Sequence, residues 1–308
     1  MGARVSILDN VRVIDGGLAT ELEQRGARID GPLWSAHVLE DQPEILLAVH
    51  RAYIEAGAQV IATASYQVSR MGYVEYGLNA AQADAALLRA VELARTAAEA
   101  YPEKRVRVAA SLGPYGAALH NGAEYHGNYD CTSEDLVRFH SERIEVLCRA
   151  QGSQRPDLLA FETFPSLDEA RAVMQALRPW PQVPVWFSFS CKDGKHSAHG
   201  EPIAECAAAV GALEQTVAVG VNCVPPRWVG SLLAELRRGT AKPLMVYPNS
   251  GEGWDAVKRC WTGTTDPGEF GVLAEGWFAA GAQIVGGCCR TGPEHIREVT
   301  GVARSGEA

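Results

Sequence analysis

The sequence has few basic residues and nowhere gathers them into a run. Its 308 residues include 28 Lys and Arg against 37 Asp and Glu, a formal net charge of −9. Such a chain has little with which to neutralise phosphates or anionic lipid headgroups, so neither nucleic acid nor a membrane is expected as a partner. Long apolar runs are also missing: no window reaches the ~20 apolar residues of a membrane span, and Met1–Asn10 has no apolar stretch behind a basic head. We therefore expect a soluble cytoplasmic protein.

Cysteine is sparse for a disulfide scaffold, since eight residues are spread irregularly along the chain. No C-x-x-C pair occurs, which argues against the common structural zinc sites and against a thioredoxin-like motif. Reduced thiols are expected. Five of the cysteines stand among ordinary neighbours and are interpreted as small, partly buried hydrophobic residues: Cys131, Cys148, Cys191, Cys206 and Cys260.

Short apolar runs, by contrast, recur along the chain. Runs rich in Val, Ile, Ala and Phe, bounded by Gly, Pro or polar residues, predict strands. Between them, segments such as Pro43–Ala56 and Ala80–Ala100 repeat apolar residues at helical spacing, and Pro43 and Gly57 supply helix start and stop signals. The eight predicted strands are Val11–Asp15, Gln59–Ala64, Val106–Leu112, Leu158–Glu162, Val185–Phe189, Val217–Asn222, Leu244–Tyr247 and Gln283–Gly286.

Eight strands alternating with helices favour an α/β fold, a (β/α)8 TIM barrel that forms a single domain over residues 1–308. The alternative is a doubly wound sheet. Against it, no G-x-G-x-x-G follows any strand, no phosphate-binding lysine loop occurs, and no break in composition marks a linker between two lobes.

Polar and glycine-rich residues collect where these runs end. In a barrel the C-terminal ends of the strands share one face, where active sites are built, so residues distant in sequence converge there. This convergence indicates an enzyme. In strand order the groups are Asp15-Gly16-Gly17, Ser65-Tyr66-Gln67, Gly113-Pro114-Tyr115-Gly116, Glu162-Thr163-Phe164, Cys191-Lys192-Asp193-Gly194, Asn222-Cys223, Pro248-Asn249-Ser250-Gly251-Glu252 and Gly287-Cys288-Cys289-Arg290.

The remaining three cysteines predict a metal site. Cys288 and Cys289 are adjacent, and adjacent cysteines rarely bond to each other because the ring is strained, so a metal or chance explains the pair. Gly286 and Gly287 allow a sharp turn that lets both sulfurs face one point. Cys223 ends another strand on the same face, and three thiolates leave one position of a tetrahedral zinc ion open, as in catalytic sites. His196 and His199 are the nearest rival ligands, but their loop is interpreted as a solvated turn.

These motifs together resemble a known family, the homocysteine S-methyltransferases, from about Val13 to Arg290. The resemblance implies a zinc-dependent barrel that makes methionine, with Cys223, Cys288 and Cys289 as the metal ligands. The motifs that carry it include Asp15-Gly16-Gly17, Thr63-Ala64-Ser65-Tyr66-Gln67, Phe161-Glu162-Thr163, Gly220-Val221-Asn222-Cys223 and Gly286-Gly287-Cys288-Cys289.

The resemblance also bears on substrate recognition. It favours Asp15 and Glu162 as partners of the homocysteine ammonium, over the interpretation of Asp15 as a turn or N-cap residue. The backbone N–H groups of Gly16 and Gly17, before the helical segment Ala19–Arg25, are expected to hold the carboxylate. The predicted substrate-binding set is completed by Asn222, Tyr66 and Trp34.

The length of the chain narrows the choice of methyl donor. The chain resembles the compact enzymes that use S-methylmethionine, with S-adenosylmethionine as a second donor, and it has no room for folate and cobalamin domains. Both donors are sulfonium cations, which aromatic faces attract. Three alternatives stay open: a methyltransferase that uses betaine or another donor, a cysteine-based redox or thiol-binding protein, and a non-catalytic barrel. We expect a monomer or a small homo-oligomer. The candidate aromatic residues are Trp34, Tyr66, Phe164, Tyr115 and Tyr247, and Leu18–Gln42 and Tyr115–Cys131 are candidate lid segments.

Overall fold

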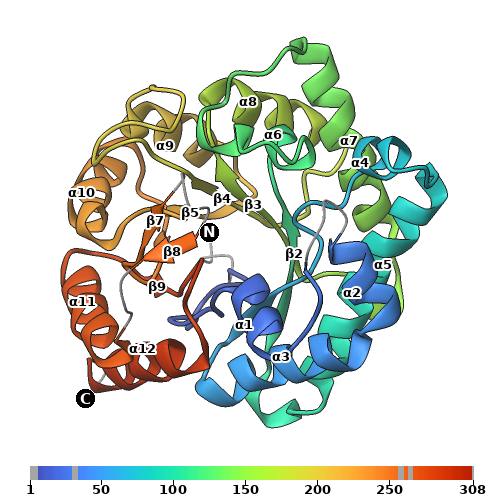
Figure 1. Ribbon diagram of the computed structural model, residues 1–308. Coiled ribbons are helices and arrows are strands. Elements are labelled where there is room, and N and C mark those ends of the chain that lie inside the picture. The colour runs from blue at the N-terminus through green and yellow to red at the C-terminus, as the bar shows by residue number, and fades with distance from the viewer. Residues whose placement is uncertain (1–5, 30–33, 256–259, 263–265, 307–308) are drawn as a thin grey trace.

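The computed structural model describes residues 6–29, 34–255, 260–262 and 266–306, and along 34–37, 253–255 and 260–262 it describes the backbone alone. At its centre is a parallel sheet of seven strands in the order β1-β2-β3-β4-β5-β6-β9. The strands lie inside a ring of helices (Figure 1). Their bounds are β1 (Val60–Ala62), β2 (Arg107–Leu112), β3 (Leu158–Phe164), β4 (Val185–Phe189), β5 (Thr216–Asn222), β6 (Leu244–Tyr247) and β9 (Ile284–Val285).

A helical segment connects each strand of this sheet to the next, as parallel pairing requires. The helices cover the outer face of the sheet, and α12 packs beside α3, so the last described helix completes the ring of helices (Figure 1). The helices are α1 (Leu18–Gln24), α2 (Trp34–Asp41), α3 (Pro43–Ala56), α4 (Arg70–Glu75), α5 (Ala80–Glu99), α6 (Tyr115–Ala118), α7 (Ser133–Arg149), α8 (Leu167–Ala176), α9 (Ile203–Gly211), α10 (Val229–Gly239), α11 (Pro267–Ala279) and α12 (Pro293–Ser305), with short 3-10 turns η1 (Pro102–Lys104), η2 (Ala123–Tyr125), η3 (Gly152–Gln154) and η4 (Pro226–Trp228).

The predicted α/β architecture with parallel strands is confirmed. The predicted helix Pro43–Ala56 has the predicted bounds, and Gly57 ends it in the left-handed conformation at φ 113°. The pattern did not predict β7 (Gly253–Asp255) and β8 (Cys260–Thr262), which form an antiparallel hairpin after β6.

The first predicted strand, Val11–Asp15, differs from the prediction. Instead of a strand it makes two single parallel bridges, one from Val13 to Val285 and one from Ile14 to Val60. These residues thus lie between β9 and β1. Because β9 is only two residues long, the hydrogen bonding there does not extend into a regular ladder.

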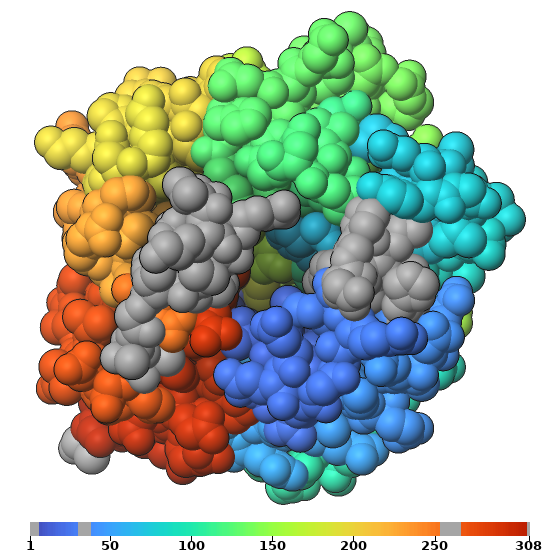
Figure 2. Space-filling model, in the orientation of Figure 1, coloured from blue at the N-terminus to red at the C-terminus, as the bar shows by residue number. Residues whose placement is uncertain are grey.

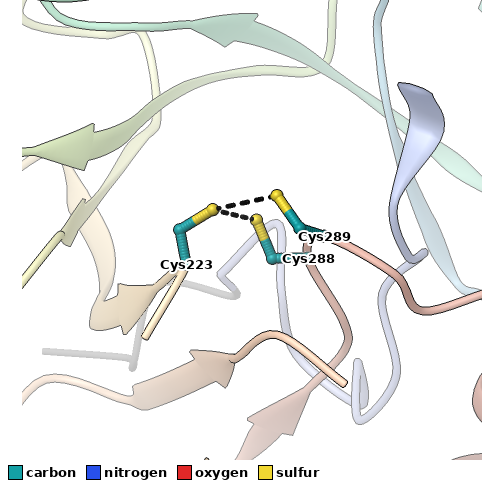
Figure 3. A group of neighbouring side chains, drawn as sticks. All are labelled: Cys223, Cys288 and Cys289. Carbon is teal, nitrogen blue, oxygen red and sulfur yellow. Dashed lines mark hydrogen bonds between the residues drawn. The ribbon is translucent and has the colours of Figure 1, made fainter. Parts of the chain in front are cut away.

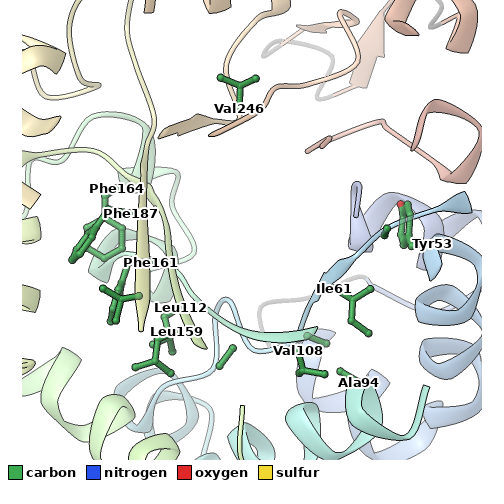
Figure 4. Close-up of a cluster of buried hydrophobic side chains, with 14 of the residues drawn as sticks. Tyr53, Ile61, Ala94, Val108, Leu112, Leu159, Phe161, Phe164, Phe187 and Val246 are labelled. Carbon is green, nitrogen blue, oxygen red and sulfur yellow. The ribbon is translucent and has the colours of Figure 1, made fainter. Parts of the chain in front are cut away.

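Two apolar layers sandwich the sheet because side chains alternate along each strand. In β3, Leu158 and Ala160 belong to a small inner cluster, while Leu159 and Phe161 join the large cluster beneath the helices. Figure 4 shows part of this outer cluster, where the rings of Phe161 and Phe187 stack at 5.2 Å. The same alternation directs residue 162 inward, toward the centre of the fold. None of the helices in the described ranges is both long and apolar enough to span a bilayer.

Candidate active site

A cavity of about 300 Å³ opens among the C-terminal ends of the sheet strands. Figure 2 shows the hollow at the centre of the molecule. Among the described residues that line it are three carboxylates, from Asp15, Glu124 and Glu162, but no Lys, Arg or His. A cavity with acidic walls and no basic group favours ligands that carry positive charge.

Three cysteines converge in this cavity. Cys223 follows β5, whereas Cys288 and Cys289 follow β9, and the three Sγ atoms all lie within 4.8 Å of one another. The Sγ of Cys223 is 2.7 Å from that of Cys288 and 3.5 Å from that of Cys289 (Figure 3). The predicted convergence of the cysteines is therefore seen in the structure.

The backbone around the cysteines leaves no room for larger residues. A Cβ on Gly287 would lie 2.1 Å from Thr291 Oγ1, and one on Gly286 would lie 2.3 Å from Ile14 Cγ1. Only glycine allows these close approaches. The chain can therefore turn after β9 so that two successive sulfurs face one point.

Electrostatics within the cysteine cluster favours a bound cation. The hydrogen bonds with Cys223 and Cys289, together with burial, raise the pKa of the Cys288 thiol well above its usual range. The hydrogen bonds from Cys223 and Cys288 lower the pKa of Cys289. The burial and close approach of the three sulfurs therefore oppose a second negative charge in the cluster, and a cation placed among them would remove this opposition.

Five inward side chains form a polar belt at the base of the cavity: Ser111, Glu162, Ser188, Asn222 and Tyr247. The hydroxyls of Ser111 and Tyr247 both donate to Glu162, the latter at 3.1 Å. Ser188 donates to Asn222 Oδ1 at 2.7 Å, and its hydroxyl also pairs with that of Tyr247. Burial raises the pKa of Glu162, although the hydrogen bonds from Ser111 and Tyr247 oppose this effect.

Asn222 uses its amide mainly within the protein. Its Oδ1 accepts from the Thr163 N–H and its Nδ2 donates to Thr163 Oγ1, both at 2.7 Å. Thr163 and Cys223 have left-handed backbones, at φ 62° and 53°, which are unfavourable for residues with a Cβ. Asn222 lines the cavity as predicted, but its contacts tie the end of β3 to the end of β5 and thereby position Cys223.

The Asp15-Gly16-Gly17 motif lies beside the cysteines. Asp15 is buried, and its Oδ2 accepts a hydrogen bond from the Ala62 N–H at 2.7 Å. Burial raises the pKa of Asp15 well above its usual value; the Ala62 hydrogen bond opposes this, and the charge of Glu162 adds to it. The cavity therefore contains two buried carboxyl groups that a cationic ligand would stabilise.

The Gly17 N–H is hydrogen-bonded within the protein, which argues against its predicted role in binding the carboxylate. This group donates to Thr291, to the carbonyl oxygen at 2.8 Å and to Oγ1 at 3.1 Å, so it is not free to bind a carboxylate. The Gly16 N–H, in contrast, has no acceptor among the residues that the structure describes. Gly17 instead allows a close approach, since a Cβ there would lie 2.3 Å from the Cys288 carbonyl oxygen.

The predicted aromatic residues separate into two groups. Tyr66 and Tyr247 line the cavity, whereas Phe164 and Tyr115 do not. The register of β3 shifts between Phe161 and Phe164, and this irregularity turns Phe164 into the outer core. Tyr115 packs against Phe139 and Tyr129 instead. The side chain of Trp34 lies outside the described residues.

His196 and His199 do not line the cavity. Their Nδ1 atoms lie 3.0 Å from Asp193 and 2.8 Å from Glu201, and both rings are exposed enough to meet solvent. This arrangement agrees with their interpretation as turn residues.

Sequence reasoning missed three residues of the cavity wall: Glu124, Tyr125 and Trp186. Trp186 lies in the apolar run of β4, where alternation alone could have placed it inward. Glu124 and Tyr125 belong to η2, in the long connection between β2 and α7, where no periodic pattern marks them. The Tyr125 hydroxyl lies 3.9 Å from Cys223 Sγ, so this connection reaches the cysteine cluster.

Comparison with known proteins gives the family. The family model described as homocysteine S-methyltransferase matches residues 12–303. The chain belongs to this family. It is 41% identical over 301 residues to homocysteine S-methyltransferase YbgG of Bacillus subtilis, with 95% of this chain and 94% of the relative covered. The crystal structure of the homocysteine methyltransferase MmuM from Escherichia coli in its metallated form matches with a TM-score of 0.84 and 39% identity, covering 96% of this chain and 98% of MmuM. A selenocysteine Se-methyltransferase of Brassica oleracea is 41% identical, with 93% of this chain and 87% of the relative covered.

The contact at Gly17 gives a first prediction. Gly17→Ala should lower the free energy of unfolding by about 1–3 kcal/mol, because the added methyl group pushes on the backbone of Cys288. It should also weaken metal binding. Denaturant unfolding and metal analysis of the purified variant measure the two effects. Gly301→Ala is the matched control: it lies inside α12 with no atom within 4 Å of the added Cβ, and should change stability by at most about 1 kcal/mol, in the favourable direction. Unchanged unfolding of Gly17→Ala would contradict the packing argument.

Proposed function

We propose that this protein is a zinc-dependent homocysteine S-methyltransferase that makes methionine from homocysteine and a sulfonium methyl donor. The observation that carries the proposal is the convergence of three cysteine sulfurs in a cavity that also holds Asp15 and Glu162. Membership of the family agrees with it, as do the names of the relatives. We also infer that Val11–Asp15 closes the sheet into a (β/α)8 barrel, and that residues 1–308 form one domain.

The three cysteine sulfurs are suitable ligands for zinc. Catalytic zinc sites use three protein ligands and keep a fourth position for substrate, and Cys223, Cys288 and Cys289 supply three sulfur ligands from two strand ends. When bound, zinc holds a coordinating thiol in its deprotonated form, which is the nucleophilic one. Three thiolates give the site a net charge of −1, which limits how much charge is withdrawn from a fourth sulfur.

We infer that Asp15 and Glu162 bind the ammonium group of homocysteine. Both carboxyls are buried and line the same cavity, and the charge of Glu162 acts on Asp15. Charge-assisted hydrogen bonds of this kind are stronger than neutral ones. The Gly16 N–H is the hydrogen-bond donor of the Asp15-Gly16-Gly17 motif that is still available, and we infer that it binds the carboxylate of homocysteine.

The reaction that we propose is a direct displacement. The homocysteine thiolate attacks a methyl carbon of the donor, a new S–CH₃ bond forms, and the bond between that carbon and the sulfonium sulfur breaks with its electron pair on the leaving sulfur. The donor leaves as a neutral thioether, so no proton has to move during the transfer. The protein orients the two substrates. Its acidic cavity attracts the ammonium group of homocysteine and the sulfonium group of the donor.

The experiment that tests this function compares donors side by side. Methionine formation from homocysteine is measured with S-methylmethionine, S-adenosylmethionine and betaine on protein purified without chelator, together with its zinc content. We expect about one zinc ion per chain and turnover with the sulfonium donors. A fully active protein that contains no metal would contradict the role of the cysteine cluster.

The carboxyl groups predict a pH dependence. The KM for homocysteine should rise as the pH falls, because protonation of Asp15 and Glu162 removes the charge that pairs with the ammonium. Since the pKa of both groups is raised, the rise should begin above the ordinary carboxyl range. Steady-state kinetics between about pH 5 and pH 8 measure it. The thiol 4-mercaptobutyrate, which lacks the ammonium, should not show this acidic rise; an identical profile for both thiols would exclude this cause.

A further inference from the structure

We propose that Glu124 is the recognition residue for the positive charge of the methyl donor, in a subsite that it forms with Gln67 and Tyr66. The inference rests on the proposed function and extends it. It divides the cavity into two cation sites: Asp15 and Glu162 for the acceptor, and Glu124 for the donor.

The Glu124 carboxylate differs from the other two in its partners. Glu162 accepts from Ser111 and Tyr247, and Asp15 accepts from Ala62. Glu124 Oε2 is buried and has no hydrogen-bond partner among the residues that the structure describes. A buried carboxylate oxygen without a donor is costly, and a cationic ligand would remove that cost.

A second acceptor points to the same ligand chemistry. Gln67 Oε1 also lines the cavity wall without a donor in the described part of the chain. Tyr66, the residue before Gln67, lines the same cavity, and the charge of Glu124 acts on its hydroxyl. Two acceptors and an aromatic ring, in a cavity whose described lining contains no basic residue, form a surface suited to a sulfonium or ammonium group.

The position of Glu124 is fixed by its segment and not by its own carboxylate. The Ser190 hydroxyl donates to the Glu124 carbonyl oxygen at 3.0 Å. At the two ends of the segment, the Tyr115 N–H and the Tyr129 hydroxyl both donate to the buried Glu169. Glu169 thus has the structural role that Glu124 lacks, which leaves the Glu124 side chain available to a ligand.

Glu124 also lies near the reacting atoms. Glu124 and the three cysteines line the same cavity, and the next residue, Tyr125, has its hydroxyl 3.9 Å from Cys223 Sγ. A donor whose positive group pairs with Glu124 would therefore have its methyl groups next to the cysteine cluster, where the homocysteine sulfur is activated. Asp15 and Glu162 lie at strand ends in the same cavity. Homocysteine and the methyl donor would therefore bind to different parts of the cavity wall, with their reacting atoms next to the cysteine cluster.

The test is Glu124→Gln, which keeps size and shape and removes the charge. Calorimetric titration of the zinc-loaded protein with S-methylmethionine, without homocysteine, should show a donor affinity that is about 10- to 100-fold weaker than for wild type. The KM for the donor should rise similarly, while zinc content, thermal stability and the KM for homocysteine stay unchanged. Asp130→Asn is the control, because it removes a negative charge from the same connection at an exposed position outside the cavity.

The affinities for two methyl donors show which positive group contacts Glu124. If Glu124 faces the sulfonium, trimethylsulfonium and S-methylmethionine lose affinity alike; if it faces the donor ammonium, only S-methylmethionine does. Either result supports the proposal. Unchanged donor affinity in Glu124→Gln, or an equal loss of homocysteine affinity, overturns it. Failure of the proposed function looks different, since wild type would then make no methionine from any sulfonium donor.

Discussion

Cys288→Ser is expected to remove the bound metal and to lower kcat/KM by at least about 10³-fold. Loss of a group that merely supports a metal ligand typically costs about 10- to 100-fold, and a direct ligand is worth more. A serine hydroxyl also does not ionise near neutral pH, so it cannot replace the thiolate. Cys223→Ser and Cys289→Ser should behave in the same way, because all three sulfurs converge on one point. Zinc analysis and initial rates at saturating donor measure the loss.

Cys131→Ser and Cys148→Ser are the controls for this series. Neither residue lines the cavity, and burial raises the pKa of both thiols, so they stay protonated and inert. Both variants should retain zinc and near wild-type rates. If Cys288→Ser keeps its metal and its activity, the cysteine cluster is not the metal site.

Asp15→Asn and Glu162→Gln should each keep zinc and lower kcat/KM for homocysteine, mainly through KM. The expected loss is about 1.5–3 kcal/mol for each, the usual worth of a hydrogen bond to a charged group. Asp15→Asn can keep the one oxygen that accepts from Ala62. Glu162→Gln keeps one of the two oxygens that accept from Ser111 and Tyr247, so one of these hydroxyls must turn to accept from the new amide NH₂. The change therefore removes charge with little change in packing.

A thiol without the amino group separates recognition from metal chemistry. Wild type and both variants should use 4-mercaptobutyrate about equally poorly. Asp193→Asn provides a matched control, since this exposed carboxylate follows β4 outside the cavity and pairs with His196. Loss of zinc from the carboxylate variants, or normal homocysteine kinetics, would show that Asp15 and Glu162 have another role.

Residues at the ends of strands could be predicted from the sequence because an apolar run marks its own limit. Cys223 and Glu162 are such residues, and the alternation of β3 directs Glu162 inward. Its place at the end of the same run also made Phe164 a candidate for the cavity wall, but its side chain lies in the outer core. Thr163 adopts a left-handed backbone there and shifts the register, and this depends on its hydrogen bonds to Asn222, 59 residues away.

Contacts between distant segments could not be predicted from local pattern. The Gly17 N–H looked free in the sequence, and only its packing against Thr291, 274 residues later, shows that it is used. Glu124 lies in a connection without periodicity, and its place in the cavity wall depends on Glu169 of α8 and Ser190 after β4. Such residues become recognisable only when the sheet has brought these segments together.

The spacing of the cysteines has a consequence for protein synthesis. Cys223 and Cys288 are 65 residues apart, which a ribosome adds in about 3–13 s at ~5–20 residues per second. During that interval a nascent chain contains only one of the three sulfurs of the proposed metal site. The proposed metal site can form only after residues 286–291 have emerged and packed against Gly16 and Gly17, which were made more than 260 residues earlier. The proposed metal site is therefore completed only after Cys289 has been made, and a chain that stalls between Cys223 and Cys288 would lack it.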